Sequence, residues 1–458
     1  MKTIFITISR GLLARNLLRS EFLNILSNQE GIRVVILVPN IRGEKPPEYF
    51  FEEFNKKNVI VEFTDNINPG KVERVFNKIV SKLVFSKSTR LFLQYHINKE
   101  KRLGNFFYFL YAAVFVPFSR LNFLKKISRI IDLNFFTNTK FSHYFDKYQP
   151  SLVFSSSIVT LYDVDFLKEA KRRKIKTISM PKSWDNLDKL LFRVEPDVLL
   201  VQNKAMKNEA KKYQALDPRS LKIVGFPQFD IYMNKEIFQS KRDYCATKGF
   251  NPELPILFLG SEGPWSKGDE IIFDAIAESR DKGLIPKCNL LVRPHFAFIK
   301  EYNYDILMKR ENLFVDDKFR KSDFFVDNWD PTKADIIDFA NSLQHCNMMI
   351  TFASTLALDA ACFNKPIIAI NYGVRIIDGA DMTKVMYETG HYDWVLKTNA
   401  VSLVENENKL LEEINYYLDN KEYKTKERKE LLSELCNSPD GHSAQRIAQS
   451  IFDSLAID

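Results

Sequence analysis

The chain has 458 residues, of which 45% are hydrophobic and 27% are charged, with 15 glycines and 18 prolines. This balance excludes a disordered chain, a collagen-like repeat and a small disulfide scaffold, and the length suits about two domains that each bury a core. The net charge of +8 is unevenly spread, because residues 1–230 contain 39 lysines and arginines against 22 acidic residues, whereas residues 231–458 contain 27 against 36. A basic half and an acidic half predict two different tasks.

The first half alternates between short apolar runs and helical patterns. Strands are predicted at residues 3–8, 33–38, 59–63, 152–155, 176–180, 198–201 and 221–224, with helices at 12–26 and 164–174. Short, continuously apolar strands separated by helices are typical of a parallel sheet covered on both faces.

Residues 64–150 interrupt this alternation. Apolar side chains recur at helical spacing over residues 72–84, with lysines and arginines on the other side, and an aromatic block at 106–111 and further basic residues follow. Basic faces beside aromatic side chains are typical of segments that lie on an anionic membrane. Residues 71–130 are therefore predicted to contact such a surface; the alternative is a helical subdomain whose apolar stripe packs on the sheet. No nucleic-acid motif accompanies the charge, so no nucleic-acid partner is expected.

A second alternation follows residues 231–254. Strands are predicted at residues 255–259, 290–293, 313–315, 348–352 and 367–370, and helices at 269–280, 336–343, 356–363, 403–418, 424–436 and 443–455. The sequence thus predicts two doubly wound, Rossmann-like α/β domains: residues 1–235, which carry the helical insertion 64–150, and residues 236–440. Residues 441–458 form a final helix that is able to pack back on the first domain. Ligands of such domains bind at the carboxyl ends of the strands.

The cysteines and the apolar runs bear on the compartment. Five cysteines, an odd number without a Cys-x-x-Cys pair, suit a reducing environment. The chain starts with a strand-like run instead of a signal peptide, and its longest apolar stretch, 106–118, is too short to span a bilayer. We expect a cytoplasmic protein, either free or peripheral on the inner face of the cell membrane.

In the first domain, Ser9-Arg10-Gly11 leaves the first strand and opens a helix. The amides of a helix start favour an anion and Arg10 adds charge, although a tight turn explains the same residues. Asp163-Val164-Asp165 fits a metal-binding Asp-x-Asp pattern, but it precedes a helix, where carboxylates favour the dipole. The histidines show no metal spacing. There is neither a Gly-x-Gly-x-x-Gly fingerprint nor a phosphate-loop lysine, which argues against dinucleotide reductases and kinase-like ATPases.

In the second domain, two strand-end loops carry polar side chains. The glycines beside Ser261 and Glu262 let the backbone approach a phosphate; Ser261 can donate a hydrogen bond, and Glu262 is either a candidate base or a solvated loop residue. Arg293 and His295, separated by a proline that stops the strand, suit diphosphate recognition or general acid work. The alternative for Arg293 is a strand-end ion pair with an aspartate.

The run 351–361 is the most informative stretch. A buried strand ends in small hydroxyl residues and a helix begins at once. Ser354 and Thr355 can cap that helix while their hydroxyls and amides meet a phosphate. Asp359 follows about one turn into the helix, on the side suited to ribose hydroxyls.

Several of these segments resemble one enzyme family. The run 351–370 is similar to the donor-nucleotide motif of glycosyltransferases with the GT-B fold. Arg293-Pro294-His295 resembles a segment of their CDP-glycerol glycerophosphotransferase-like and bacterial surface-polysaccharide members. In the first domain, residues 183–187 resemble these proteins too, as do residues 201–210 followed by 224–230, which contain the family's usual Gly-x-Pro-x-x-Asp pattern. The resemblance implies a GT-B transferase that moves a sugar from a nucleotide-activated donor to a glycan or lipid-linked acceptor in surface polysaccharide biosynthesis.

Three positions depart from the family pattern. Asp359 stands where glutamate is common and offers the ribose a shorter arm. Thr351, eight residues earlier, shows that the paired glutamates of many retaining members are absent, which favours an inverting reaction. His295 is followed by Phe296, where proline is frequent.

The resemblance implies roles for individual residues. It assigns the donor phosphates and ribose to Ser261, Ser354, Thr355 and Asp359, and the leaving group to Arg293 and His295, which would replace a metal, so no metal or other cofactor is expected. Asp185 is the first candidate for the base and Glu262 the second. The acceptor is expected at Ser9, Arg10, Gly11 and Trp184.

Other functions remain open. Glycerol phosphate transfer from a CDP donor and epimerisation of a UDP-amino sugar use the same fold. A non-catalytic polysaccharide or membrane adaptor is the alternative of another class, and it would show no thermal stabilisation by nucleotides.

Overall fold

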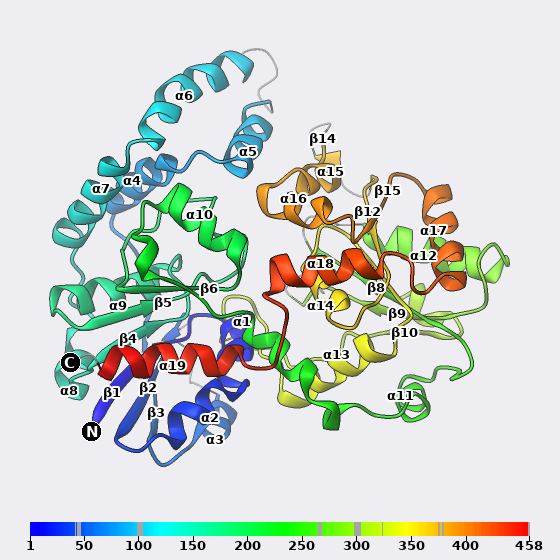
Figure 1. The fold of residues 1–458 in the computed structure, drawn as a ribbon, viewed down its shortest axis with the longest axis horizontal. Coiled ribbons are helices and arrows are strands. Elements are labelled where there is room, and N and C mark those ends of the chain that lie inside the picture. Colours follow the sequence, from blue (N-terminus) through cyan, green and yellow to red (C-terminus); the bar gives the residue numbers. More distant parts are fainter. Residues whose placement is uncertain are drawn as a thin grey trace. The chain divides into compact units, whose positions relative to one another are not determined.

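The computed structural model describes all residues except 42, 44–46, 99–103, 264–267, 297–303, 323, 374–375, 378–379 and 457–458. The chain divides into two units (Figure 1). The first consists of residues 1–230, 322–330 and 440–458, and the second of residues 231–321 and 331–439. Each unit is built on its own parallel sheet.

The sheet of the first unit has seven strands in the order β3-β2-β1-β4-β5-β6-β7. They are β1 (Lys2–Thr7), β2 (Ile32–Asn40), β3 (Val59–Asp65), β4 (Leu152–Ser155), β5 (Lys176–Ser179), β6 (Val198–Val201) and β7 (Leu221–Ile223). All seven were predicted from their apolar runs, and the doubly wound α/β class is confirmed. The order of the strands reverses between β1 and β4, and ligands of open α/β sheets bind at the carboxyl side of such a point.

Helices cover both faces of this sheet and form an arm beyond it. They are α1 (Gly11–Leu13), the π-helical turn η1 (Ala14–Leu18), α2 (Glu21–Asn28), α3 (Glu48–Phe54), α4 (Lys71–Val80), α5 (Lys87–Asn98), α6 (Gly104–Ser119), α7 (Asn122–Phe135), α8 (Ser142–Tyr148), α9 (Leu161–Arg172), α10 (Lys204–Gln214) and α19 (Ser443–Ala456). The apolar residues Phe22, Ile447 and Ile451 of α2 and α19 are fully buried in one core. The C-terminal helix thus belongs to the first unit.

The motif at residues 224–230 anchors that last helix. The Asp230 carboxylate accepts hydrogen bonds from the amides of Ser443 and Ala444, at 3.0 and 2.7 Å. A carboxylate at a helix start satisfies amides that have no partner within the helix. Gly225 has a φ of +83°, and a β-carbon there would meet the hydroxyl of Ser443. The Gly-x-Pro-x-x-Asp motif therefore has a structural role in this chain.

A short excursion from the second half also belongs to the first unit. The division predicted from the sequence places residues 322–330 in the second domain, whereas here Phe324 and Phe325 are buried in the core of the first unit. Asp330 pairs with Arg19 at 2.6 Å and accepts the hydroxyl of Tyr49 at 2.7 Å. Two aromatic side chains and a buried ion pair therefore fasten this segment.

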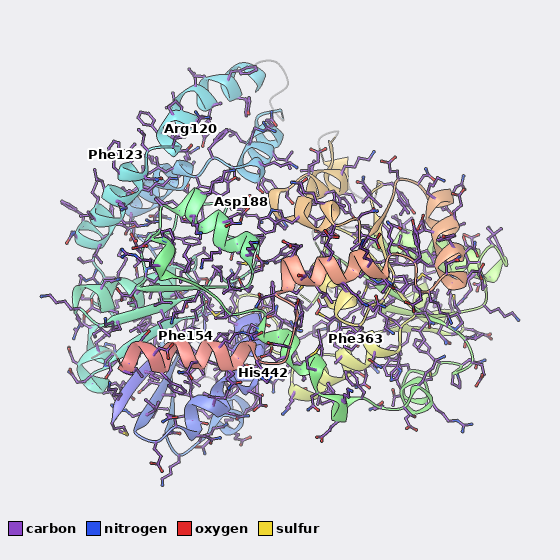
Figure 2. All side chains as sticks on the ribbon, viewed as in Figure 1. Arg120, Phe123, Phe154, Asp188, Phe363 and His442 are labelled. Carbon is purple, nitrogen blue, oxygen red and sulfur yellow. The ribbon has the colours of Figure 1, made fainter. Side chains whose placement is uncertain are left out.

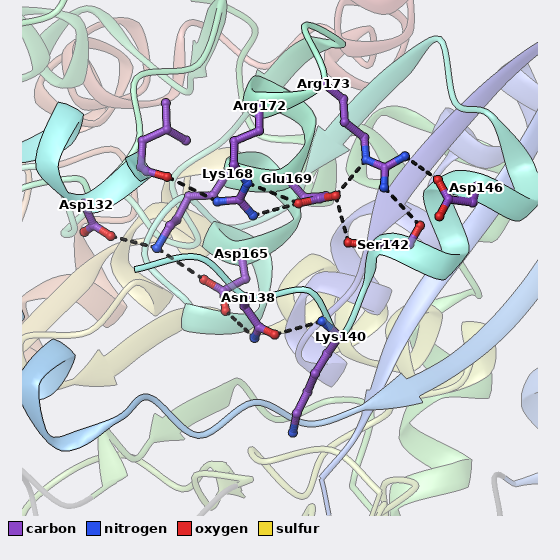
Figure 3. Close-up of polar contacts among 11 residues, drawn as sticks. Asp132, Asn138, Lys140, Ser142, Asp146, Asp165, Lys168, Glu169, Arg172 and Arg173 are labelled. Carbon is purple, nitrogen blue, oxygen red and sulfur yellow. Dashed lines mark hydrogen bonds and ion pairs between the residues drawn. The ribbon is translucent and has the colours of Figure 1, made fainter. Parts of the chain in front are cut away.

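Along α7 of the helical insertion, polar and charged side chains are buried, whereas apolar side chains are exposed. Its buried side chains are polar or charged: Lys125, Ser128, Arg129 and Asp132. The Asp132 carboxylate accepts a hydrogen bond from Lys168 of α9 at 2.8 Å (Figure 3). It also pairs with the guanidinium of Arg193 at 2.6 Å. Arg129 donates to the carbonyls of Phe192 and Gln214. These bonds give Asp132 and Arg129 partners in the interior, so this polar face of α7 points inward.

The opposite face of this insertion is apolar and exposed. The side chains that share this exposure lie on α4, α6 and α7 and include Val72, Val75, Ile79, Phe109, Leu110, Val114, Phe118, Phe123, Ile127, Ile130 and Phe135. Phe123 is 57% exposed and projects from the outer side of the arm near the exposed Arg120 (Figure 2). The predicted stripe at residues 72–84 is split, because Phe76 and Val80 pack inward whereas Val72, Val75 and Ile79 do not. No helix within the described residues is both long and apolar enough to cross a membrane.

The sheet of the second unit has six strands in the order β10-β9-β8-β11-β12-β15. They are β8 (Ile256–Gly260), β9 (Asn289–Arg293), β10 (Leu313–Val315), β11 (Met348–Thr351), β12 (Ile367–Ile370) and β15 (Ser402–Val404), beside the two-stranded pair β13 (Ile376–Ile377) and β14 (Ala380–Asp381). Its helices are α11 (Lys241–Lys248), α12 (Asp269–Asp281), α13 (Lys333–His345), α14 (Leu356–Cys362), α15 (Met382–Tyr387), α16 (Gly390–Lys397), α17 (Glu407–Asp419) and α18 (Thr425–Cys436). The predicted helix 403–418 was wrong at its start, because residues 402–404 pair with β12 as an edge strand.

Candidate functional site

The carboxyl ends of β8 and β11 meet at the centre of the second sheet. Thr351 at the end of β11 donates its hydroxyl to the carbonyl of Gly260 at 2.8 Å. A β-carbon on Gly260 would overlap the side chain of Leu356, the first residue of α14. Glycine therefore lets α14 start directly against the loop that leaves β8. This brings the two loops of the predicted donor site together.

The loop after β8 turns its polar groups inward. Ser261 is buried, and its hydroxyl accepts the amide of Gly263 at 3.2 Å. Glu262 lies close to Tyr387 and Tyr392, whose pKa values are raised mainly by burial and further by the charge of this glutamate. The hydroxyls of these two tyrosines donate to the carbonyls of Ile370, at the end of β12, and of Phe352, just after β11. The rest of the loop, residues 264–267, lies outside the described residues.

Arg293 and His295 follow β9. The Arg293 guanidinium pairs with the carboxylate of Asp316 and lies 4.5 Å from the ring centroid of Phe339. The structure thus shows the strand-end ion pair that was the alternative for this arginine. His295 stacks on Phe296, with ring centroids 4.4 Å apart, and burial lowers the pKa of His295 to about 4. Its imidazole is neutral at pH 7 in this state, so the positive charge beside β9 comes from Arg293.

The start of α14 holds three of the predicted donor residues. Ser354 caps the helix, because its hydroxyl accepts the amide of Leu356 at 3.3 Å. Thr355 is exposed and, within the described part of the chain, its side chain makes no capping bond, so the predicted cap by Thr355 was wrong. Asp359 is only 8% exposed and accepts the hydroxyl of Tyr232 at 2.6 Å.

Tyr232 was missed by the sequence analysis. It follows Asp230 by two residues in a 3-10 helix (Pro227–Met233), and its ring packs on Phe363 with centroids 5.0 Å apart. Its hydroxyl fixes the orientation of the Asp359 carboxylate. Only its closeness to the Gly-x-Pro-x-x-Asp motif could have indicated it, since the pairing with Asp359 spans 127 residues.

The amides of the first helix in the first unit already hold an anion. Those of Gly11 and Leu12 each donate to one oxygen of Asp327, at 3.0 Å. The expectation that these amides bind the acceptor is thereby corrected for Gly11, because a carboxylate of the chain itself takes the place of an external anion. Ser9 is buried, whereas Arg10 is half-buried at the N-cap.

The remaining predicted residues of the first unit are also engaged. Trp184 is 4% exposed and is part of the core, so it offers little surface to an acceptor. Asp185 pairs with Lys189 and accepts the side-chain amide of Asn186 at 3.1 Å. The assignment of Asp185 as the base stays a prediction, with Lys189 and Asn186 as neighbours of its carboxylate.

Comparison with known proteins shows which family and which solved structures this chain resembles. Residues 277–453 match the family model of CDP-glycerol:poly(glycerophosphate) glycerophosphotransferase. The structure of MnaA from S. aureus with UDP is similar, with a TM-score of 0.57 and 12% identity, over 100% of this chain and 98% of that one. The wall teichoic acid polymerase TagF gives a TM-score of 0.52 and 10% identity, over 99% of this chain and 89% of that one.

The fold is GT-B. UDP-GlcNAc 2-epimerase from Neisseria meningitidis, solved with UDP-GlcNAc, shares it with a TM-score of 0.54 and 10% identity, over 99% of this chain and 100% of that one. No curated protein sequence matches the chain. The family match and the fold together support a transferase enzyme, as the motifs predicted.

The two carboxylates of the Asp-x-Asp pattern in this GT-B chain, Asp163 and Asp165, contact different side chains. Asp163, in the first turn of α9, accepts the hydroxyl of Thr7, whereas Asp165 contacts Lys168 and Asn138. Among the described residues, no three His, Cys, Asp or Glu side chains are grouped as metal ligands. The Asp-x-Asp pattern thus reflects a helix start and two separate polar contacts.

Asp163 makes the stability of the first unit depend on pH. Burial raises the pKa of Asp163 to about 7, so its protonated form favours the folded state and this contribution is lost as the pH rises from about 4 through 7. In chemical denaturation, the free energy of unfolding of Asp163→Asn should not fall in this way. Relative to that of the native protein, it should rise by about 2–4 kcal/mol between pH 5 and pH 9. Asp217→Asn, at an exposed carboxylate whose pKa is lowered to about 2, is the control and should show no such gain. Equal pH profiles for the native protein and Asp163→Asn would contradict the assignment.

Proposed function

We propose that this chain transfers a group from a nucleotide-activated donor to a hydroxyl of a glycan or lipid-linked acceptor in surface polysaccharide biosynthesis. The match of residues 277–453 to a glycerophosphotransferase family carries the proposal, because that range contains Arg293, Ser354 and Asp359. The same match favours CDP-glycerol as the donor. A nucleotide sugar is the second candidate, since the similar MnaA and epimerase structures hold UDP and UDP-GlcNAc.

The second unit supplies the groups that a nucleotide diphosphate needs. One guanidinium nitrogen of Arg293 donates to Asp316, and the guanidinium lies over the ring of Phe339. A guanidinium has five N–H donors, so others are left for a ligand. It can therefore contact phosphate oxygens without leaving its ion pair. Asp359, oriented by Tyr232, is a hydrogen-bond acceptor suited to ribose hydroxyls.

The proposed reaction is a displacement. The acceptor oxygen attacks the donor carbon or phosphorus and loses its proton to a base, while the nucleotide leaves with the electron pair of the broken bond. Arg293 would stabilise the charge that develops on the leaving phosphate. Asp185, which pairs with Lys189, and Glu262 are the two candidates for this base. No metal is required in this proposal, so turnover should be unchanged after dialysis against EDTA.

A nucleotide panel read by melting temperature tests the proposal. At 100 times its Kd, the correct nucleotide should stabilise the chain by about 2.7 kcal/mol, with CDP or CMP more effective than UDP and GDP if glycerol phosphate is transferred. Arg293→Gln should weaken this binding by about 10- to 100-fold, because hydrogen bonds to charged groups are strong. Arg310→Gln, at an arginine that pairs with Asp274 and Asp281, is the matched control and should bind as the native protein does. If no nucleotide stabilises the native protein, a non-catalytic adaptor becomes the better interpretation.

We also propose that the helical arm docks on an anionic membrane, which would bring the enzyme to a lipid-linked acceptor. The exposed apolar side chains of α4, α6 and α7 are accompanied by exposed basic residues: Lys71, Arg74, Lys78, Arg120 and Lys126. Apolar and basic side chains on one surface are what an interfacial segment needs. The polar network beneath α7 supports this interpretation, because it holds the apolar face outward.

Sedimentation with vesicles that contain phosphatidylglycerol tests the membrane proposal. The native protein should bind at low salt and be released at high salt. Replacing Phe123, Ile127 and Ile130 together with serine should lower binding by about tenfold or more, because each fully buried large apolar side chain contributes about 1.5–3 kcal/mol. The control replaces Leu284 and Ile306 of the second unit, which are equally exposed, with serine. Binding that the control reduces as strongly as the triple variant would contradict the proposal.

A further inference from the structure

Two cations follow strands that flank β4 in the sheet of the first unit. Arg10 follows β1 and Lys182 follows β5, and β4 lies between these two strands. Burial lowers the pKa of Lys182 most, and the positive charge of Arg10 lowers it further. Two like charges held together in a half-buried place favour the binding of an anion.

The carboxylates near this pair are engaged elsewhere. Asp327 interacts electrostatically with both Lys182 and Arg10, but its two oxygens accept the amides of Gly11 and Leu12. Asp163 interacts with Arg10 as well, and it accepts the hydroxyl of Thr7. Asp185 acts on it too, but pairs with Lys189. Within the described residues, neither Arg10 nor Lys182 forms an ion pair. The positive charge of the pair is thus not offset by a carboxylate in direct contact.

Hydrogen-bonding groups without partners lie at the same strand ends. The Nε of Arg10 is buried without a hydrogen-bond partner among the described residues. The same holds for the hydroxyl of Ser156, which directly follows β4 and is 1% exposed. Buried polar atoms normally have a partner, so donors left open beside two cations indicate a ligand. The reversal of strand order at β1 and β4 is also where open α/β sheets bind ligands.

We propose that Arg10 and Lys182 bind a phosphate group of the acceptor in the first unit. This inference rests on the proposed function, because it gives that acceptor its chemical class, a phosphate ester. Arg10 supplies a planar guanidinium that can contact two phosphate oxygens, and Lys182 supplies a compact ammonium for a third. The ester would then present its hydroxyl from a fixed position.

Protection of Lys182 from acetylation tests this site without any turnover. The rate at which sulfosuccinimidyl acetate modifies Lys182 is measured by mass spectrometry with glycerol 3-phosphate, inorganic phosphate or uncharged glycerol present. Glycerol 3-phosphate should slow modification of Lys182 several-fold while glycerol has no effect. Arg10→Gln should raise the glycerol 3-phosphate concentration needed for protection by about tenfold or more. The control Arg120→Gln, at an exposed arginine of the arm, should leave it unchanged.

The outcomes separate this site from the donor site. Absent protection, or protection that Arg10→Gln leaves unchanged, overturns the inference even where nucleotides stabilise the native protein. Equal protection by inorganic phosphate and glycerol 3-phosphate also overturns it, since the site would then bind a free ion and not an ester. Failure of the proposed function is seen separately, as a nucleotide panel without any stabilisation. A melting temperature of Arg10→Gln close to that of the native protein ensures that the variant reports on binding.

Discussion

Gly11→Ala should destabilise the first unit by about 3 kcal/mol or more. A β-carbon at position 11 would overlap the carbonyl oxygen of Trp329 and lie 2.6 Å from its carbonyl carbon. Backbone cannot yield as a flexible side chain does, so residues 322–330 would have to move away. That movement would strain the two hydrogen bonds to Asp327 and the burial of Phe325.

Scanning calorimetry measures this effect as a fall of about 6–12 °C in the melting temperature of the first unit. Gly70→Ala is the matched control, because Gly70 precedes α4 with a φ of −63° and a β-carbon there would meet nothing within 4 Å. It should change stability by about 0.5 kcal/mol or less. A Gly11→Ala protein as stable as Gly70→Ala would show that residues 322–330 are not fastened to the first unit as described.

The strands could be predicted from the sequence, whereas the excursion could not. Continuous apolar runs such as residues 256–259 are buried on both faces of a parallel sheet, so local composition is enough to find them. Residues 322–330 have no such local signal. Their position depends on the absence of a side chain at Gly11 and on the ion pair with Arg19. Both residues lie more than 300 positions earlier in the sequence.

The helical insertion shows a second limit. Periodicity identifies two faces of a helix, but it does not say which face is buried. On α7 the usual assignment is reversed, because Lys168 and Arg193 supply partners that make burial of Asp132 favourable. Those partners come from later parts of the chain, so the segment alone could not reveal the inversion.

The candidate site was predicted in its loops more than in its contacts. The donor loops around Arg293 and Ser354 were placed at strand ends, where the structure has them. Tyr232, the partner of Asp359, was not foreseen, and for Arg293 only the kind of partner, an aspartate, was anticipated as an alternative. A loop position follows from the strand that precedes it, whereas a side-chain partner depends on tertiary packing.

Asp132→Ala should cost about 3–5 kcal/mol of the free energy of unfolding. The change leaves Lys168, whose side chain is 1% exposed, without its closest carboxylate (Figure 3). It also removes both bonds from Asp132 to the Arg193 guanidinium. Breaking a buried pair leaves an uncompensated charge in a poorly solvated place, which costs more than the pair itself contributes. Chemical denaturation measures this loss.

Asp146→Ala is the control, because the Asp146 side chain is 63% exposed and its pair with Arg173 should contribute about 0–1 kcal/mol. Adding Lys168→Met to Asp132→Ala should recover part of the loss, since the uncompensated ammonium is then gone. The same network keeps the apolar face of α7 outward, so Asp132→Ala should also weaken binding to phosphatidylglycerol vesicles, while Asp146→Ala should not. If Asp132→Ala costs no more than Asp146→Ala, the buried charges do not set the orientation of α7, and the exposed apolar face would need another cause.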